Sequence, residues 1–208
     1  YLSKATWAQK TITDWKIAWR MAARFVAGSD LEDALKVIQI LNGKGINVTL
    51  DHLGEHTTNA TEALQATQDI LKALDGIQRA GVRANVSIKL TQIGLNIDAA
   101  LCSENLRTIL EHAWNLGNFV RIDMEDASVT QLTLDILRQM RQRGYQNVGI
   151  VIQSYLYRSA ADVDSLIKEC VKVRLCKGAY KESAEVAYPK KRDVDAAYDR
   201  LAEMLIHG

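Results

Sequence analysis

Five β-rich runs alternate with amphipathic helical segments along this 208-residue chain. The runs are Ile46 to Glu55, Val82 to Gly94, Asn118 to Glu125, Asn147 to Tyr155 and Val171 to Tyr180. Helical periodicity fills the gaps, as in residues 60–81, 103–117 and 130–144, and each of these segments ends in glycine, the usual helix stop. Strand-helix-strand units impose a parallel sheet with right-handed crossovers, either closed as a barrel or open and doubly wound.

The order of polar residues favours the barrel. The first run continues into DHLGEH, which lacks the glycine-rich turn that an open dinucleotide-binding sheet needs. Read with a period of two, one strand face is apolar and the other is polar. The polar face carries Asn47, Thr49, Asp51, Ser87, Lys89, Thr91, Arg121, Asp123, Glu125, Gly149, Val151, Gln153, Arg174 and Cys176. Charges near the carboxyl ends of strands are typical of the mouth of a (β/α) barrel, where active sites lie.

The charges at this mouth have both signs. The cations Lys89, Arg121, Arg174 and Lys177 face the anions Asp51, Asp123 and Glu125. Charges at such depth must neutralise one another or meet a ligand, because burying them unpaired is costly. A mixed site of this kind suits a zwitterion better than a phosphate.

Composition restricts the classes of binding partner and the cellular compartment that we expect for the chain. The chain has 26 Lys+Arg against 25 Asp+Glu, so it has no general attraction for nucleic acid. Three cysteines without a CxxC pair favour a reducing compartment, and no apolar run is long enough to span a bilayer. We expect a cytoplasmic protein of one partial barrel domain over residues 1–208, with N-terminal helices over 1–45 and five barrel units over 46–208. The start at Tyr1 suggests a fragment.

Four motifs on successive strands carry a family resemblance. They are SIKLTQIG, NFVRIDMED, GIVIQSYLYR and VRLCKGAY, and together they resemble the FAD-dependent proline dehydrogenases, most closely the bacterial monofunctional ones. The resemblance runs from about Arg24 to the last helix. It implies a distorted (β/α)8 barrel that oxidises L-proline to 1-pyrroline-5-carboxylate, the first step of proline catabolism. The electrons would pass to FAD and then to a membrane quinone, so contact with the inner face of the membrane is also expected.

The resemblance also implies residue roles. Asp123 and Arg174 would be catalytic, with Arg174 near the flavin N5 edge, and Lys89 and Tyr180 would bind the substrate. The cofactor would be held by Met124, Gln153, Arg174, Lys177, Gly178 and Ala179, and no metal is implied. Met124 fits the period of two less well, since it should point outward unless the strand end turns.

The chain departs from the family pattern at its C-terminal side. The family's sixth to eighth strands, and a final helix whose arginine pair grips the carboxylate, have no counterpart in the sequence. We therefore expect this chain alone to hold FAD weakly, to self-associate, and to gain activity when that part is supplied.

Several other interpretations remain open on the residues alone. Lys89 and Asp123 could form a structural ion pair, Arg174 could pair with Asp123 or Glu125, and Gln153 could be a satisfied interior amide. His52 and His56 have the spacing of a helical metal site, although Gly54 argues against a helix there. The tryptophans Trp7, Trp15 and Trp19 predict an amphipathic helix that packs on the barrel or lies at a membrane surface. Rival functions are a Schiff-base aldolase that uses Lys89 or Lys177, and an inactive binding module.

Overall fold

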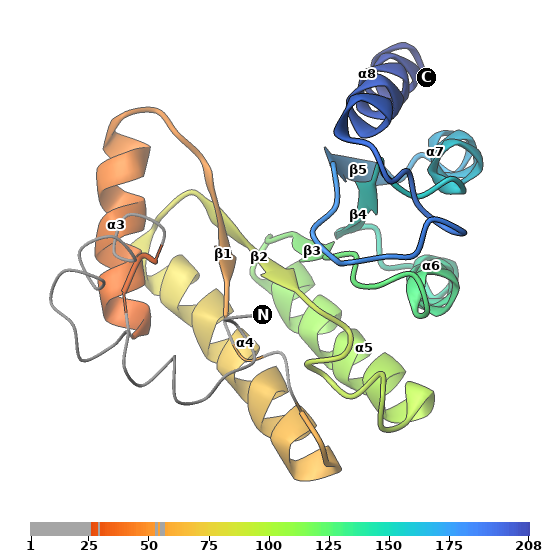
Figure 1. Ribbon diagram of the computed structural model, residues 1–208. Helices are drawn as coiled ribbons and strands as arrows, with labels where there is room; N and C mark the ends of the chain where they lie inside the picture. Colours follow the sequence, from red (N-terminus) through yellow and green to blue (C-terminus); the bar gives the residue numbers. More distant parts are fainter. Residues whose placement is uncertain (1–25, 29, 53, 55–56) are drawn as a thin grey trace, which may run out of the picture. The chain divides into compact units, whose positions relative to one another are not determined.

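The computed structural model describes residues 26–28, 30–52, 54 and 57–208 (Figure 1). The chain divides into two compact units. The first contains Tyr1–Val48 and Gly76–Ala84, and the second contains Thr49–Asp75 and Asn85–Gly208. The helix predicted around the three N-terminal tryptophans lies outside the described residues.

Five strands form one sheet in sequential order. They are β1 (Val48–Asp51), β2 (Ala84–Ile88), β3 (Val120–Ile122), β4 (Val148–Gln153) and β5 (Lys172–Cys176). The sheet order is β1-β2-β3-β4-β5, and β2 to β5 are joined by parallel pairings. An open doubly wound sheet reverses its strand order at a switch point, whereas a barrel wall does not. The predicted fold class, an α/β barrel type with five βα units, is therefore confirmed.

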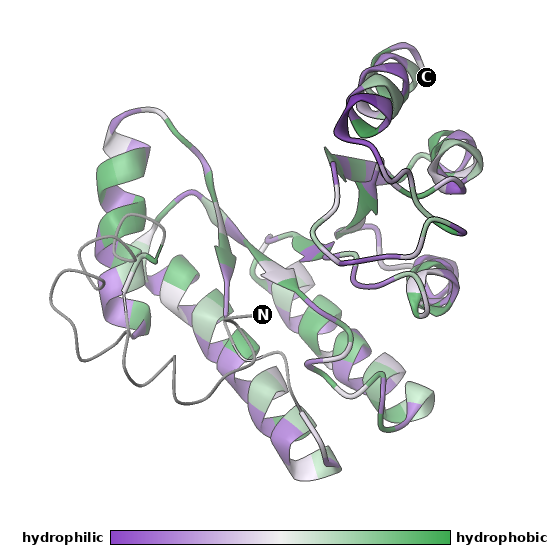
Figure 2. Ribbon diagram, viewed as in Figure 1, coloured by the Kyte–Doolittle hydropathy of each residue, from purple (hydrophilic) through white to green (hydrophobic). Residues whose placement is uncertain are grey.

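A helix follows each strand. These helices are α4 (Ala60–Ala80), α5 (Ala99–Asn115), α6 (Thr130–Gln142), α7 (Ser159–Lys168) and α8 (Lys191–His207). In the second unit α6 and α7 pack on β4, and α8 packs on β5. Hydrophobic and hydrophilic residues alternate along α5 and α6, as expected of helices with one buried face (Figure 2). Asp98 begins α5, because its carboxylate accepts hydrogen bonds from the amides of Ala100 and Leu101 at 2.6 and 3.2 Å.

The first unit has a small core of its own. Helix α3 (Leu31–Gly43) begins at Asp30, whose carboxylate accepts the Asp33 amide at 2.9 Å. The helix buries Ala34, Leu35 and Ile38. Its C-terminal end is tied to the segment before β2, since Asn42 Oδ1 accepts the Arg83 amide at 2.6 Å.

The register of the sheet supports the predicted division into two faces. Ile88, Ile122 and Ile150 are paired across β2, β3 and β4 and are fully buried. Next to them, Ser87, Arg121 and Gly149 share a row on the other face, which Lys172 continues on β5. Further along the same face, Val151 pairs with Arg174 and Gln153 pairs with Cys176.

The strands are shorter than the β-rich runs indicated. β2 ends at Ile88 and β3 ends at Ile122, so the alternation of faces stops there. Residues 90–97 form turns. Lys89, Thr91, Asp123 and Glu125 consequently lie just beyond the carboxyl ends of the strands, where loops rather than pleating direct their side chains.

Candidate active site

Three side chains from three different parts of the sheet meet at the centre of the candidate site. Asp123 follows β3, Ser87 lies on β2 and Arg174 lies on β5. Asp123 Oδ1 accepts a hydrogen bond from Ser87 Oγ at 2.5 Å and another from Arg174 Nη2, and Arg174 Nη2 also donates to Ser87 Oγ at 3.0 Å. Ser87 is buried and the Asp123 side chain is 17% exposed, whereas the Arg174 side chain is 40% exposed. A fixed cation therefore reaches the surface of the site.

Lys89 pairs with Asp51, one of the three anions expected at the mouth. Its Nζ lies 3.2 Å from Asp51 Oδ2, at the end of β1, and its side chain is only 12% exposed. The alternative of a structural ion pair between Lys89 and Asp123 is thus replaced by two pairs, Lys89 with Asp51 and Arg174 with Asp123. Asp51 ends β1, which is the neighbour of β2 in the sheet order.

Gln153 links β4 to the loop that follows β3. Its Nε2 donates to the carbonyl oxygens of Met124 at 2.7 Å and of Glu125 at 3.3 Å. Its Oε1 is buried and has no hydrogen-bond partner among the described residues. Gln153 is therefore only half satisfied as an interior amide, and a buried acceptor is left over at the inner face of the sheet. Met124 is buried next to it, because β3 has already ended at Ile122.

Glu125 anchors the loop that follows β2. Its carboxylate accepts the Thr91 amide at 3.0 Å and also the Thr91 hydroxyl. Both residues are buried. Glu125 was expected to face the cations of the cavity. It lies three residues past the end of β3, and the contacts with Thr91 tie it to the loop after β2.

The KGAY segment after β5 combines an ion pair with a close backbone approach. Lys177 Nζ lies 2.5 Å from Asp195 Oδ1 on α8, and Asp195 raises the pKa of the Lys177 ammonium group. Gly178 has a φ of +122°, and a Cβ there would lie 2.5 Å from the Tyr155 ring. Ala179 is exposed and Tyr180 is half-buried.

Arg121 lies in the same row of the sheet as Ser87, and its guanidinium reaches toward β5. Its guanidinium donates to the Lys172 carbonyl at 2.8 Å and lies 5.0 Å from the centre of the Phe119 ring. Gly149 makes room for these groups, because a Cβ would lie 2.7 Å from Phe119 Cζ and 2.4 Å from the Lys172 oxygen. Arg121 thus packs on the backbone of β4 and β5 next to the charged cluster, and burial together with the charge of Arg174 lowers the pKa of its guanidinium.

His52 and Cys176 have structural surroundings. His52 Nδ1 lies 3.2 Å from Gln92 Nε2, which also donates to the His52 carbonyl at 3.0 Å. His56 lies outside the described residues, so the predicted alternative of a metal at these two histidines stays untested. Burial is the main cause that raises the pKa of the Cys176 thiol, which makes the thiol a poor nucleophile.

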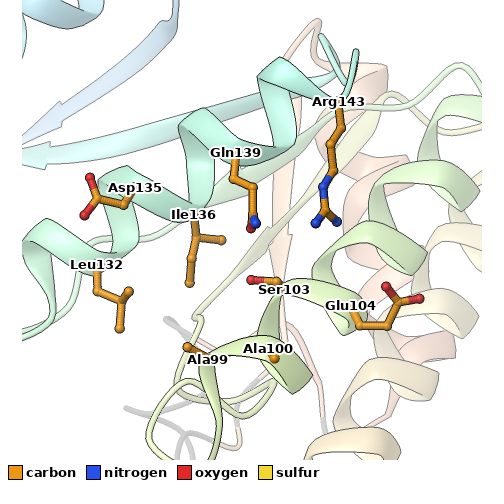
Figure 3. Close-up of a pocket in the computed structure, with 9 residues that line it drawn as sticks. All are labelled: Ala99, Ala100, Ser103, Glu104, Leu132, Asp135, Ile136, Gln139 and Arg143. Carbon is orange, nitrogen blue, oxygen red and sulfur yellow. The ribbon is translucent and has the colours of Figure 1, made fainter.

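A separate groove of about 450 Å³ lies between α5 and α6. Gln139 and Ile136 extend from α6 toward Ser103 and Ala99 on α5 (Figure 3). The lining residues come from the two helices and the residue after α6, and they include none of the charged residues at the strand ends. The groove is therefore distinct from the candidate active site.

Comparison with known proteins decides the family. The sequence profile described as proline dehydrogenase matches residues 34–208. Proline dehydrogenase 2 of Bacillus subtilis (strain 168) is 39% identical over 210 residues, which cover all of this chain and 68% of the relative. This chain belongs to the proline dehydrogenase family. Proline dehydrogenase of Deinococcus radiodurans is 40% identical over 187 residues, covering 88% of this chain and 60% of the relative.

A solved structure of the same family has the same fold. The crystal structure of proline utilization A (PutA) from Bdellovibrio bacteriovorus, inactivated by N-propargylglycine, superposes with a TM-score of 0.83 at 26% identity. It covers 91% of this chain, and this chain corresponds to 24% of PutA. Membership makes the chain an oxidoreductase of proline catabolism, so the family predicted from the four motifs is confirmed.

Proline dehydrogenases are a flavoenzyme family, and two observations in this chain fit a flavin. The Gln153 Oε1 acceptor, buried and unpaired within the described residues, could accept a hydrogen bond from a ring N–H. The exposed edge of Arg174 adds a cation at the same end of the sheet.

Two partners in the site were not assigned a role from the sequence. Ser87 was placed on the inner face by its parity, but nothing in the pattern indicated that it joins Asp123 to Arg174. Asp195 lies on α8, 18 residues beyond Lys177, and strand parity carries no information about such a helix residue. The contact between Lys177 and Asp195 bridges a loop, and only the structure shows it.

Proposed function

We propose that the natural protein oxidises L-proline to 1-pyrroline-5-carboxylate with FAD as the electron acceptor. Family membership over residues 34–208 supports the reaction class. The observation that carries the proposal to this site is the ion pair of Arg174 and Asp123 at the carboxyl ends of parallel strands. Active sites of barrel enzymes lie at that end of the sheet.

One group of side chains would bind the substrate, and another would bind the cofactor. Lys89, held by Asp51, would present its ammonium group to the proline carboxylate, and Tyr180 would lie against the ring. Asp123 keeps Arg174 in place and provides a negative charge where the proline nitrogen carries a positive one. These roles require the substrate to lie between the loops that follow β2 and β5.

The cofactor side is formed by residues of β4, of β5 and of the loops after β3 and β5. Bound FAD would accept two electrons from proline as a hydride equivalent. Arg174 would hold its positive charge near the edge of the flavin ring that becomes electron-rich, which favours the transfer electrostatically. Gln153 would accept a ring N–H through Oε1, while Met124, Lys177, Gly178 and Ala179 would line the ring and its substituents.

The aldolase alternative has less support than the flavoenzyme at both Lys89 and Lys177. A Schiff-base lysine needs a lowered pKa so that its amine is neutral. Asp195 raises the pKa of Lys177 instead, and Lys89 lies beside the Asp51 carboxylate. Among the described residues no helix is long and apolar enough to cross a membrane. The proposal also includes a membrane quinone as the next electron acceptor.

We also propose that the five described βα units are part of a larger barrel. The chain spans 68% of the Bacillus subtilis relative, and β1 and β5 are the edges of the described sheet. Unpaired edges favour association with another chain. The 208-residue chain alone should accordingly bind FAD weakly and self-associate.

The test is product formation in two forms of the protein. One is the 208-residue chain, and the other, called the completed protein below, carries after Gly208 the C-terminal part of Bacillus subtilis proline dehydrogenase 2 that follows the matched region. With FAD and a dye as electron acceptor, L-proline should yield 1-pyrroline-5-carboxylate in the completed protein and much less in the chain alone. A completed protein that binds FAD but forms no pyrroline product would contradict the proposal.

A further inference from the structure

We infer that Ser87 is a positioning residue that fixes the Arg174 guanidinium against Asp123, and this inference rests on the proposed function. Ser87 lies in β2, which is separated from β5 by two strands in the sheet order. Its hydroxyl nevertheless contacts both members of the ion pair. The three groups therefore tie the ends of β2, β3 and β5 together on the inner face.

The contacts form a closed triangle. Ser87 Oγ donates its one proton to Asp123 Oδ1 at 2.5 Å and accepts from Arg174 Nη2 at 3.0 Å. Arg174 Nη2 closes the triangle by donating to the same Asp123 Oδ1. A hydroxyl can donate and accept at the same time, which an alanine, a carboxylate or an ammonium group in its place could not do.

Burial makes this arrangement specific to Ser87. The Ser87 side chain is buried in the strand, so its hydroxyl has a fixed origin, while Arg174 is long and 40% exposed. Without a second anchor, a single contact to Asp123 would leave the guanidinium free to turn about that contact. Two acceptors on one Nη2 nitrogen define the plane of the guanidinium as well as its distance.

The consequence concerns the part of Arg174 that remains for a ligand. Within the described residues, the hydrogen bonds of Arg174 leave from Nη2, so Nη1 and Nε are not used by Ser87 or Asp123. Ser87 fixes the plane in which these two remaining nitrogens lie, so we expect it to act on the rate of the reaction through Arg174 rather than by touching the substrate.

The direct test is the mobility of the Arg174 guanidinium, measured by NMR on protein with 15N-labelled arginine. Rotation about the Cζ–Nη2 bond is recorded in the wild type, in Ser87→Ala and in Ser87→Thr, for both the 208-residue chain and the completed protein. Ser87→Ala should speed the rotation at least about fivefold, the effect of losing one net hydrogen bond. Ser87→Thr keeps the hydroxyl and should retain the slow rotation.

A matched control separates this role from general loosening. Ser154 is also fully buried, but its hydroxyl donates to the Val194 carbonyl at 3.3 Å, on the side of the sheet where α8 lies. Ser154→Ala should leave Arg174 unchanged. If Ser87→Ala does not fold, Ser87→Cys keeps nearly the same volume with a much weaker donor, and Arg174 should again turn faster.

Kinetics give the functional consequence. In the completed protein, Ser87→Ala should lower kcat for proline about tenfold with KM changed by less than about twofold, because a misoriented group costs rate. Ser87→Thr should restore kcat. If the wild-type completed protein does not oxidise proline, the proposed function fails, and the NMR result still decides the role of Ser87.

Three results would overturn the inference. The first is an Arg174 signal that stays as rigid in Ser87→Ala or Ser87→Cys as in the wild type. The second is an equal gain in mobility in Ser154→Ala, which would mean that any lost buried hydroxyl has the same effect. The third is a Ser87→Ala enzyme that has wild-type kcat together with a mobile Arg174.

Discussion

The guanidinium of Arg174 on β5 forms an ion pair with the carboxylate of Asp123 beyond β3, although β4 lies between those strands. Because strands lie about 4.8 Å apart, such a pair requires both side chains to project from the same face of the sheet and the arginine to extend across β4. It also holds a cation at the end of the sheet where substrates bind in barrel enzymes.

Replacing Arg174 with Met should slow the reduction of bound flavin by proline about a hundredfold, the usual cost of losing one charge-stabilising donor. The flavin reduction potential should also fall, since a cation nearby favours the electron-rich ring. Anaerobic stopped-flow and redox titration of the completed protein measure both quantities. Arg138→Met is the matched control, because Arg138 pairs with Glu169 at the surface. An unchanged rate and potential in Arg174→Met would make Arg174 purely structural.

Asp123→Ala should lower proline oxidation at least about a hundredfold, because Arg174 loses its charged anchor and the site loses its anion. The fold should survive, since the Arg174 side chain is 40% exposed and water can solvate it. Circular dichroism should give a melting temperature close to that of the wild type. Asp123→Asn keeps an oxygen for Ser87 and Arg174 and should retain more activity than Asp123→Ala. Full turnover in Asp123→Ala would remove Asp123 from the site.

Gly178→Ala should destabilise the protein through both its backbone and its neighbour. An alanine at a φ of +122° costs about 1–2 kcal/mol, and its Cβ would lie 2.5 Å from the Tyr155 ring, which adds about 1–3 kcal/mol. Gly144→Ala is the control, because Gly144 has a φ of +101° with nothing within 4 Å of the added Cβ. Urea unfolding should place Gly178→Ala below Gly144→Ala, with FAD affinity reduced only in Gly178→Ala.

A change at Tyr155 tests whether the clash with its ring contributes to the cost of Gly178→Ala. If the clash exists, the cost of Gly178→Ala should shrink in a Tyr155→Ala background, so that the two changes are less than additive. Strict additivity would mean that the ring does not limit the space at position 178. In that case only the backbone would explain the glycine.

Cys102 should make stability fall at alkaline pH. Burial raises the pKa of its thiol from the ordinary value of 9.0 to about 12, and the side chain is fully buried. The stabilisation is complete below pH 9, where the thiol is neutral in both states, and it is lost as pH rises toward the folded pKa. From pH 8 to 10 the unfolding free energy of the wild type should drop by about 1.4 kcal/mol more than that of Cys102→Ala. Equal pH profiles would contradict the buried neutral thiol.

The alternation of strand and helix, and the parity of each strand, were enough to predict the fold class and the inner face. Ser87, Arg174 and Gln153 lie within strands, so a period of two placed them correctly. The sequence did not specify which residues pair where the pleating stops. Lys89 and Glu125 follow strand ends, and their partners, Asp51 and Thr91, are set by the path of loops that no local pattern encodes.

The roles within the site came from the four motifs rather than from residue chemistry. Parity could bring Asp123 and Arg174 to one cavity, but it left open whether Lys89 or Arg174 would pair with Asp123. Lys89 lies one residue past the end of β2, where sequence periodicity no longer fixes the direction of a side chain. Helix α8 supplies Asp195 to Lys177, and that contact depends on a tertiary approach across a loop.

The central claim is that these residues form a flavin site that proline can reduce. The most direct test is the visible spectrum of the completed protein, reconstituted with FAD and mixed anaerobically with L-proline. The absorbance band of the oxidised flavin should bleach within the time of a turnover, and D-proline in a parallel sample should leave it unchanged. A bound flavin whose band persists in L-proline, or a completed protein that retains no flavin at all, would contradict the account.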